Sequence, residues 1–497
     1  MSLWSWITGK KQSDSARSQY DAAATTRHNA KHWTYADGSD ADSALSPDLP
    51  TLRNRARDEI RNNSYAKGIV DTFSNDVIGP GPTLQYIPEV ETKFNAWMRE
   101  SDMSGRLSFA DSLKLNIVQL LESGEALISL SGNRYLNIDY STHIDGVQER
   151  TPGLKLLQIE PDRLSTPWGY IGSPSMREGV EVDVYGKPLR YHILRQHPGD
   201  ATNYQQDQYN IVDADNIIHL FRQDRPGQSR GVPWITPALP LFADLRRYTQ
   251  AVIAAAETAA DLSAVLEGTA EDLQPADIDA LDVIDIERRS MVTLPLGWKM
   301  NQFKPEQPTT SYKDFKHEII NEICRCLNMP LNVGLGNSAG YNYASGRLDW
   351  QVYYQTIAVI RSWVGRIVCD RVFSEWLREA VMIPGYFSPQ TTILIHNNTE
   401  KVEWLWIGRK HVDPQKEANA SKTRTDTGIS TLIDEWVSEG KDPDVQQAKL
   451  IKEVKWYAEN GLVHPLAKVA PVPVVGQQQE PVIDEGDDER DNDDEDE

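Results

Sequence analysis

Apolar residues recur at helical spacing in the first part of the chain. Between 49 and 79 this pattern predicts one helix that begins after Ser46-Pro47. The run Gly79-Pro80-Gly81-Pro82 ends it, because proline lacks the backbone donor that a helix needs. Shorter helices are predicted near 90–100 and 108–122. The apolar face of the first helix consists of Leu52, Ala56, Ile60, Ile69, Phe73 and Val77.

Runs with strand-like composition follow these helices. They are short, rich in aliphatic residues and separated by turn-forming residues. Together with the helices they predict an α+β body. The predicted strands are 125–132, 153–161, 181–186, 189–195 and 216–222.

Two further helices are predicted on either side of a small separate segment. The first, 241–266, is rich in alanine and would be about 39 Å long; the second, 309–328, would be about 30 Å long. Between them, 267–308 combines an acidic stretch with a strand-like run at 291–303. The pattern predicts a helical stalk that carries a small tip.

The C-terminal part is predicted to be mainly helical. Apolar positions spaced by four or eight predict a long helix over 348–380, interrupted only at Gly365. The run TTILIH at 391–396 predicts a strand. Three short helices are then indicated by Asp413-Pro414, by Thr431 with Asp434 as a capping box, and by Asp442-Pro443.

Charge and length limit the class of protein. The chain has 497 residues, which suggests two to four domains, and a net charge of −22. The segment 480–497 alone contains 12 acids and one base, so 466–497 is expected to be a disordered acidic tail and 1–45 a mobile arm. A conventional DNA-reading protein would be basic, so tight nucleic-acid binding is not expected.

Neither a disulfide framework nor a membrane segment is predicted. The three cysteines, Cys324, Cys326 and Cys369, form no paired pattern and no zinc motif, which indicates a reducing compartment. No apolar run approaches the roughly 18–20 residues that a membrane span requires. We therefore expect a soluble cytosolic protein that has no membrane partner, no metal and no cofactor.

The run GNSAG at 336–340 fits the G-x-S-x-G pattern of a serine hydrolase, with Ser338 as the nucleophile. That motif needs a strand, a sharp turn and a helix, whereas a helix end and Pro330 precede Gly336. A serine hydrolase is therefore kept only as the alternative, and no catalytic residue is expected. The loop around Ser338 is flexible and carries no charge before Arg347, which suits transient contact with a sliding polymer; it also fits a connector that contacts nothing.

Several short motifs resemble, in order and spacing, the lambda-type family of tailed-bacteriophage portal proteins. The resemblance covers about 45–465. The motifs are RARD (55–58), RNNSYA (61–66), NDVIGPG (75–81), ESGEA (122–126), IEPDRL (159–164), HLF (219–221), RPGQSRGVP (225–233) and DPQKEA (413–418).

The resemblance implies an α+β subunit of portal type, assembled as a ring, usually of twelve copies, at one capsid vertex. Its implied parts are an α/β wing (46–240), two stem helices (241–266 and 309–330), a small α/β clip (267–308), a tunnel loop (331–346), a long kinked helix with the second part of the wing (347–412) and a C-terminal helical crown (413–465).

The resemblance also implies a function without catalysis. Double-stranded DNA would be packaged through the ring by the terminase motor and later ejected. Other implied partners are major capsid and scaffold proteins and head-completion or tail adaptor proteins, in the virion and, during assembly, in the host cytoplasm. Arg288, Arg289 and Lys299 of the clip would face the terminase large subunit; a role as solvent-facing bases fits them equally well. The residues expected to face DNA are Asn337, Ser338, Tyr341, Asn342, Tyr343, Ser345 and Arg347.

Overall fold

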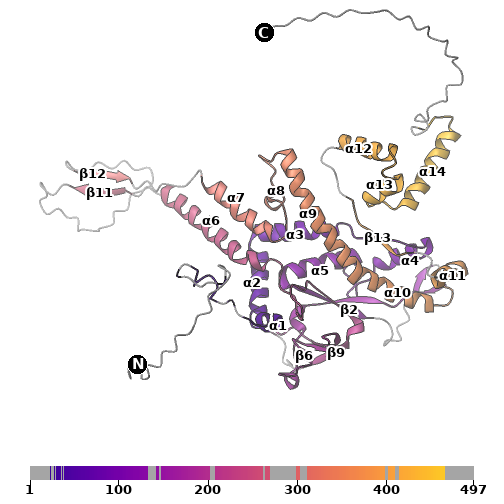
Figure 1. The fold of residues 1–497 in the computed structure, drawn as a ribbon, viewed down its shortest axis with the longest axis horizontal. Coiled ribbons are helices and arrows are strands. Elements are labelled where there is room, and N and C mark those ends of the chain that lie inside the picture. The colour runs from indigo at the N-terminus through magenta and orange to yellow at the C-terminus, as the bar shows by residue number, and fades with distance from the viewer. Residues whose placement is uncertain are drawn as a thin grey trace, which may run out of the picture. The chain divides into compact units, whose positions relative to one another are not determined.

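The computed structural model describes residues 38–131, 141–144, 147–201, 208–260, 264–268, 298–302, 311–397, 401–408 and 414–464, with a few positions between 23 and 36. The chain divides into two compact units, Met1–Trp406 and Ile407–Glu497. The larger unit combines helices with antiparallel sheets, as Figure 1 shows, and this confirms the predicted α+β class.

The N-terminal region forms three helices: α1 (Ala41–Leu45), α2 (Leu49–Asn62) and α3 (Ser64–Ile78). The single helix predicted over 49–79 is therefore wrong at Asn63, whose backbone is extended. The side-chain oxygen of Asn63 accepts hydrogen bonds from the backbone amides of Tyr65 and Ala66, and so caps the start of α3. The short α1 lies within the segment predicted to be a mobile arm.

The helices predicted near 90–100 and 108–122 are confirmed as α4 (Pro88–Met98) and α5 (Phe109–Ser123). A capping box formed by Ser108 and Asp111 starts α5. Helices α3 to α5 share an aromatic-rich core with α10 (Asp370–Met382). At its centre the ring of Phe94 meets Phe373 and Trp376 edge-on, with centroids 5.2 and 5.0 Å apart.

The central sheet has three antiparallel strands in the order β10 (Ile217–Phe221), β2 (Glu125–Ser131), β5 (Lys155–Ile159). These strands confirm the predictions for 216–222, 125–132 and 153–161. On the N-terminal side of β2, α5 ends at Gly124, so the helix leads directly into the sheet.

A second sheet has four antiparallel strands in the order β6 (Met176–Arg177), β7 (Val180–Val182), β8 (Pro188–Leu194), β9 (Tyr209–Asp213). The strand predicted at 189–195 is confirmed as β8. The one predicted at 181–186 is too long, because the Asp183 carboxylate accepts the amides of Tyr185 and Lys187 and turns the chain there. The edge strand β9 was not predicted.

Two of the three described two-stranded sheets lie outside the segment between α6 and α7. β1 (Thr83–Gln85) pairs with β13 (Glu403–Leu405) and so joins the two ends of the larger unit in sequence. β3 (Ser141–Ile144) pairs with β4 (Val147–Arg150).

Helices α6 (Leu239–Ala260) and α7 (Ser311–Arg325) form the predicted pair on either side of a small segment (Figure 1). The ring of Tyr248 on α6 stacks on Tyr312 and meets Phe315 edge-on, at 5.6 and 4.7 Å between centroids. In the described part of the chain, no helix is both long and apolar enough to cross a membrane.

The helix predicted over 241–266 is wrong at its C-terminal end. Residues 264–266 belong to β11 (Ala264–Gly268), which pairs with β12 (Trp298–Gln302) inside the strand-like run predicted at 291–303. The alanine-rich sequence is thus helical up to Ala260, as its composition favours, and cross-strand pairing sets the conformation of 264–266.

The long helix predicted over 348–380 begins earlier and has the interruption predicted at Gly365. It consists of α9 (Tyr343–Val364), a π-helical segment (Gly365–Cys369) and α10. A short helix, α8 (Leu331–Leu335), precedes it.

The strand predicted at 391–396 is wrong, because these residues lie in α11 (Pro389–Asn397). Pro389 at the first helical position and the Ser388 hydroxyl, which accepts the amide of Thr391, start a helix. The N-terminal cap thus favours a helix here, although β-branched residues such as Thr391 and Ile393 are typical of strands.

The smaller unit contains the three predicted short helices: α12 (Pro414–Asp426), α13 (Leu432–Ser438) and α14 (Pro443–Glu459). The capping box of Thr431 and Asp434 and the cap by Asp442 are confirmed. Asp413 lies outside the described residues, as does the tail 466–497.

Candidate functional site

The loop between α8 and α9 is shorter than the predicted tunnel loop. Of the segment 331–346, residues 331–335 are helical and α9 begins at Tyr343, so the loop proper is 336–342. Pro330 precedes the first turn of α8, and Gly336 ends it with a left-handed backbone (φ 63°).

Two local hydrogen bonds shape this loop. The Asn337 side chain accepts the amide of Ala339 at 2.9 Å, and the carbonyl of Ser338 accepts the amide of Tyr341 at 3.1 Å. The loop is therefore a pair of tight turns that exposes the short polar side chains of Asn337, Ser338 and Asn342.

The residues predicted to face DNA divide into three groups. Asn337, Ser338 and Asn342 are exposed in the loop. The Tyr341 hydroxyl donates a hydrogen bond to Asp349 of α9 at 3.1 Å, which ties this ring to the helix. The remaining three residues, Tyr343, Ser345 and Arg347, lie on the first two turns of α9. Ser345 and Arg347 are exposed, and the side chain of Tyr343 lies outside the described residues.

The serine hydrolase alternative lacks its required geometry. A nucleophile elbow presents serine between a strand and a helix, whereas the segment before Ser338 is the helix α8. Among the described residues, no histidine is hydrogen-bonded to the Ser338 hydroxyl. The described geometry of this segment therefore differs from that of a nucleophile elbow.

The residues predicted to face the terminase are placed only in part. Lys299 lies on β12, in register with Glu267 of β11. Arg288 and Arg289 lie outside the described residues.

A buried charge cluster lies at the start of β2, the middle strand of the central sheet. Glu125 at the start of β2 is 0% exposed. Its Oε1 contacts guanidinium nitrogens of Arg53 and Arg230 at 2.6 and 2.5 Å, and its Oε2 contacts Nε2 of His219 at 2.9 Å. Burial alone would raise the pKa of Glu125, but Arg230, Arg53 and His219 keep it well below its usual range, so the carboxylate stays ionised.

Arg230 connects this cluster to the surrounding loops. Its guanidinium donates to the carbonyl oxygens of Pro161, Leu164 and Glu178 at 3.0, 3.2 and 2.8 Å. The segment from Arg230 then runs into α6, where Arg246 pairs with Glu59 of α2 at 2.6 Å. Arg230 therefore connects β2 with the loops that follow β5 and β6.

Two glycines allow the backbone to close around Glu125. A Cβ atom on Gly124, whose φ is +87°, would lie 2.4 Å from the carbonyl oxygen of Gly231. A Cβ on Gly231 would lie 2.0 Å from the carbonyl oxygen of Gly124. Only glycine fits at either position.

The sequence motifs ESGEA, IEPDRL, HLF and RPGQSRGVP converge on this cluster. Sequence reasoning assigned them no physical role, since their members are far apart in the chain. The available signal was a glycine beside a charged residue in Gly124-Glu125 and in Arg230-Gly231, which indicates a close backbone approach.

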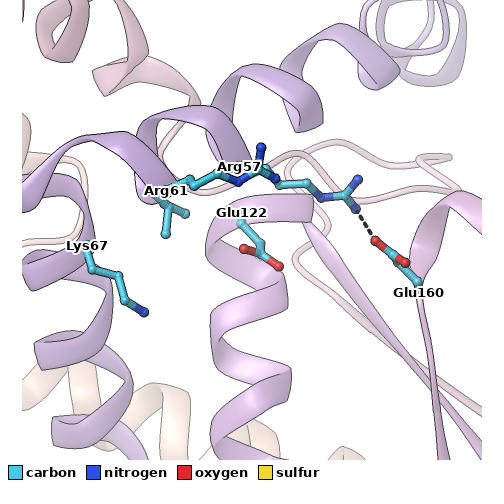
Figure 2. Close-up of a pocket in the computed structure, with 6 residues that line it drawn as sticks. Arg57, Arg61, Lys67, Glu122 and Glu160 are labelled. Atoms are coloured by element: carbon cyan, nitrogen blue, oxygen red, sulfur yellow. Dashed lines mark ion pairs between the residues drawn. The ribbon is translucent and has the colours of Figure 1, made fainter. Parts of the chain in front are cut away.

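A pocket of about 440 Å³ opens beside the cluster (Figure 2). Figure 2 shows the Glu122 carboxylate between Arg61 and Lys67 on one side and Glu160 on the other. Burial raises the pKa of Glu122, and Arg57 offsets part of that increase. The lining mixes both signs of charge, so it favours neither an anion nor a cation. The lining residues are Arg57, Ile60, Arg61, Lys67, Glu122 and Glu160.

Glu160, Asp162 and His197 bring three potential metal ligands within 4.8 Å of one another. However, the amide of Gly199 donates to Nδ1 of His197 at 3.0 Å, which leaves the ring proton on Nε2, the nitrogen that faces the carboxylates. Arg57 contacts both carboxylates as well. The group is better explained as an ion-pair network than as a metal site.

Comparisons with known proteins give one consistent family. The family model described as phage portal protein, lambda family, matches residues 26–361. The probable portal protein of Halomonas phage phiHAP-1 is 27% identical over 484 residues, which covers 90% of this chain and 88% of that protein. Portal protein B of Escherichia phage lambda is 20% identical over 472 residues, which covers 85% and 87%.

Solved structures with a similar chain include the virion of a native gene transfer agent particle. The match has a TM-score of 0.46 and 14% identity, and covers 80% of this chain and 94% of that chain.

Proposed function

Because the chain belongs to the lambda family of phage portal proteins, we propose that twelve copies of it assemble into a ring at one capsid vertex. The ring encloses the channel through which double-stranded DNA is packaged and later ejected. The role is structural, and no covalent bond is made or broken by the chain.

The observation that carries this proposal is the order of elements around the loop 336–342. In chain order the strand pair β11–β12 lies between the helices α6 and α7, and α7 leads through α8 to the loop and then to α9 (Figure 1). Exposed Asn337, Ser338 and Asn342 offer hydrogen bonds without positive charge. Phosphate contacts from lysine or arginine would add salt-dependent affinity, so a neutral loop lets DNA move past.

The same proposal assigns partner proteins to parts of the ring. The segment 267–308 would meet the terminase large subunit during filling, with Arg288, Arg289 and Lys299 as its basic residues, and head-completion or tail adaptor proteins afterwards. Major capsid and scaffold proteins would contact the ring at the vertex. The protein would then reside in the virion, and in the host cytoplasm during assembly.

Deletion of residues 337–340 tests the loop. The described contacts of this segment are local, so rings should still form, while DNA packaging or retention should fall severalfold in a packaging assay. Ser338→Ala is the matched control and should package normally, because the loop contributes its shape and neutrality rather than one hydroxyl. Normal filling by the deletion variant would contradict the role, and loss of filling in Ser338→Ala would reopen the enzyme alternative.

A further inference from the structure

Helix α9 has two apolar faces, and within the described part of the chain only one of them is buried. One face packs into the core of the larger unit. The other exposes Leu348, Val352 and Val359, which are 65, 53 and 63% exposed. The buried face consists of Tyr353, Ile357, Ile360 and Val364, at 0, 3, 9 and 1% exposed.

The exposed apolar residues form a stripe rather than a scatter. At 3.6 residues per turn, Leu348, Val352 and Val359 fall within an arc of about 40°. The buried residues fall roughly on the opposite side of the helix, so the two faces are distinct. Single exposed apolar residues need no explanation, whereas an aligned set on one face indicates a contact surface.

This side of α9 also carries no charge. The sequence has no Asp, Glu, Lys or Arg between Asp349 and Arg361. The exposed polar residues beside the stripe are Gln351, Gln355 and Ser362. A solvent-facing helix normally carries charges, and 25% of this chain is charged. Depletion of charge is the compositional mark of an interface core.

We propose that this uncharged α9 face, formed by Leu348, Gln351, Val352, Gln355, Val359 and Ser362, packs against a second copy of the chain, its neighbour in the ring. The inference rests on the proposed function and adds to it the surface that joins the copies. Each copy has a net charge of −22, so copies repel one another. An uncharged face lets two of them meet without placing like charges together.

In a ring, the position of the loop 336–342 would depend on the neighbouring copy. Copies related by rotation meet head to tail, so the uncharged α9 face contacts a different surface of its neighbour. Because α9 begins at Tyr343, directly after the loop 336–342, the neighbouring copy fixes where each loop stands. The channel lining is then incomplete in any single copy.

The first test compares assembly of three proteins by mass photometry. Leu348→Asp/Val352→Asp/Val359→Asp should raise the concentration needed for ring formation at least tenfold, with unchanged circular dichroism. The matched control is Val184→Asp/Tyr185→Asp, which alters residues that are 93 and 92% exposed at the β7–β8 turn. It should assemble like the unmodified chain.

The outcomes separate this inference from the proposed function. If the unmodified chain forms rings and the triple variant forms them equally well, the inference is overturned while the portal role stands. If the unmodified chain never forms rings, the portal role fails and the inference fails with it.

A second measurement covers the case in which the triple variant does not fold. Val352→Cys carrying an environment-sensitive fluorophore should show a blue-shifted emission when rings assemble. Absence of a shift would overturn the inference. A red shift in the unassembled protein on deleting residues 1–37 would also overturn it, since the chain's own N-terminal segment would then cover the face.

Discussion

Glu125 contributes more to the larger unit than its single charge suggests. A buried carboxylate is costly unless it is paired, and here two guanidiniums, one imidazole and the amide of Gly231 satisfy its two oxygens. Such a cluster does not by itself prove high stability, because desolvation offsets much of the attraction. It does make each member hard to remove alone.

We predict that Glu125→Gln lowers the free energy of unfolding by about 3–5 kcal/mol, because it removes the carboxylate that the buried Arg230 and Arg53 contact at 2.5 and 2.6 Å, and the Asp162 carboxylate lies farther from Arg53, at 3.8 Å. Urea denaturation followed by tryptophan fluorescence measures this. Glu403→Gln is the control, since Glu403 pairs with Lys401 at an exposed site and should cost less than about 1 kcal/mol. Equal stability of the two variants would show that the cluster is dispensable.

Helix α11 is attached to α4 by one carboxylate. Glu89 on α4 accepts hydrogen bonds from the Ser388 amide and hydroxyl and from the Thr391 hydroxyl, at the start of α11. These bonds, with the ammonium of Lys93, lower the pKa of Glu89 to about 2. The contact therefore depends on pH.

Because the pKa of Glu89 is lower in the folded chain than its ordinary value of about 4.5, the ionised carboxylate stabilises the fold at any pH above about 4.5. This contribution to stability is lost as the pH falls from about 4.5 towards about 2. We therefore predict that the stability difference between the unmodified chain and Glu89→Gln shrinks over this window. Urea midpoints at pH 6, 4 and 3 measure it. Glu100→Gln, at an exposed position, should show a constant difference; a constant difference for Glu89→Gln would refute the coupling.

At the level of elements, the sequence predicts what is encoded locally. The capping box at Thr431 and Asp434 and the interruption at Gly365 are read from neighbouring residues, and both are confirmed. The break at Asn63 and the helix over 391–396 were mispredicted because single capping side chains outweighed a continuous apolar pattern. The Glu125 cluster was not predicted, since only the fold brings its members together.

At the scale of the whole molecule, the proposed function requires several copies of the chain to assemble into one ring. Family membership could be predicted from ordered motifs, because they mark glycines and charges that the fold needs at fixed places. A surface pattern within one chain can indicate where a neighbour packs, but subunit number and the identity of other partners also depend on residues of those other chains. In the proposed ring, the net charge of −22 per copy would repel phosphate rather than hold it.

The central claim is tested most directly by electron microscopy of the purified, assembled protein viewed end-on. The account predicts closed rings with an open centre wide enough to admit a DNA double helix. A folded preparation that stays monomeric, or that forms only particles without a central opening at any concentration, would contradict it.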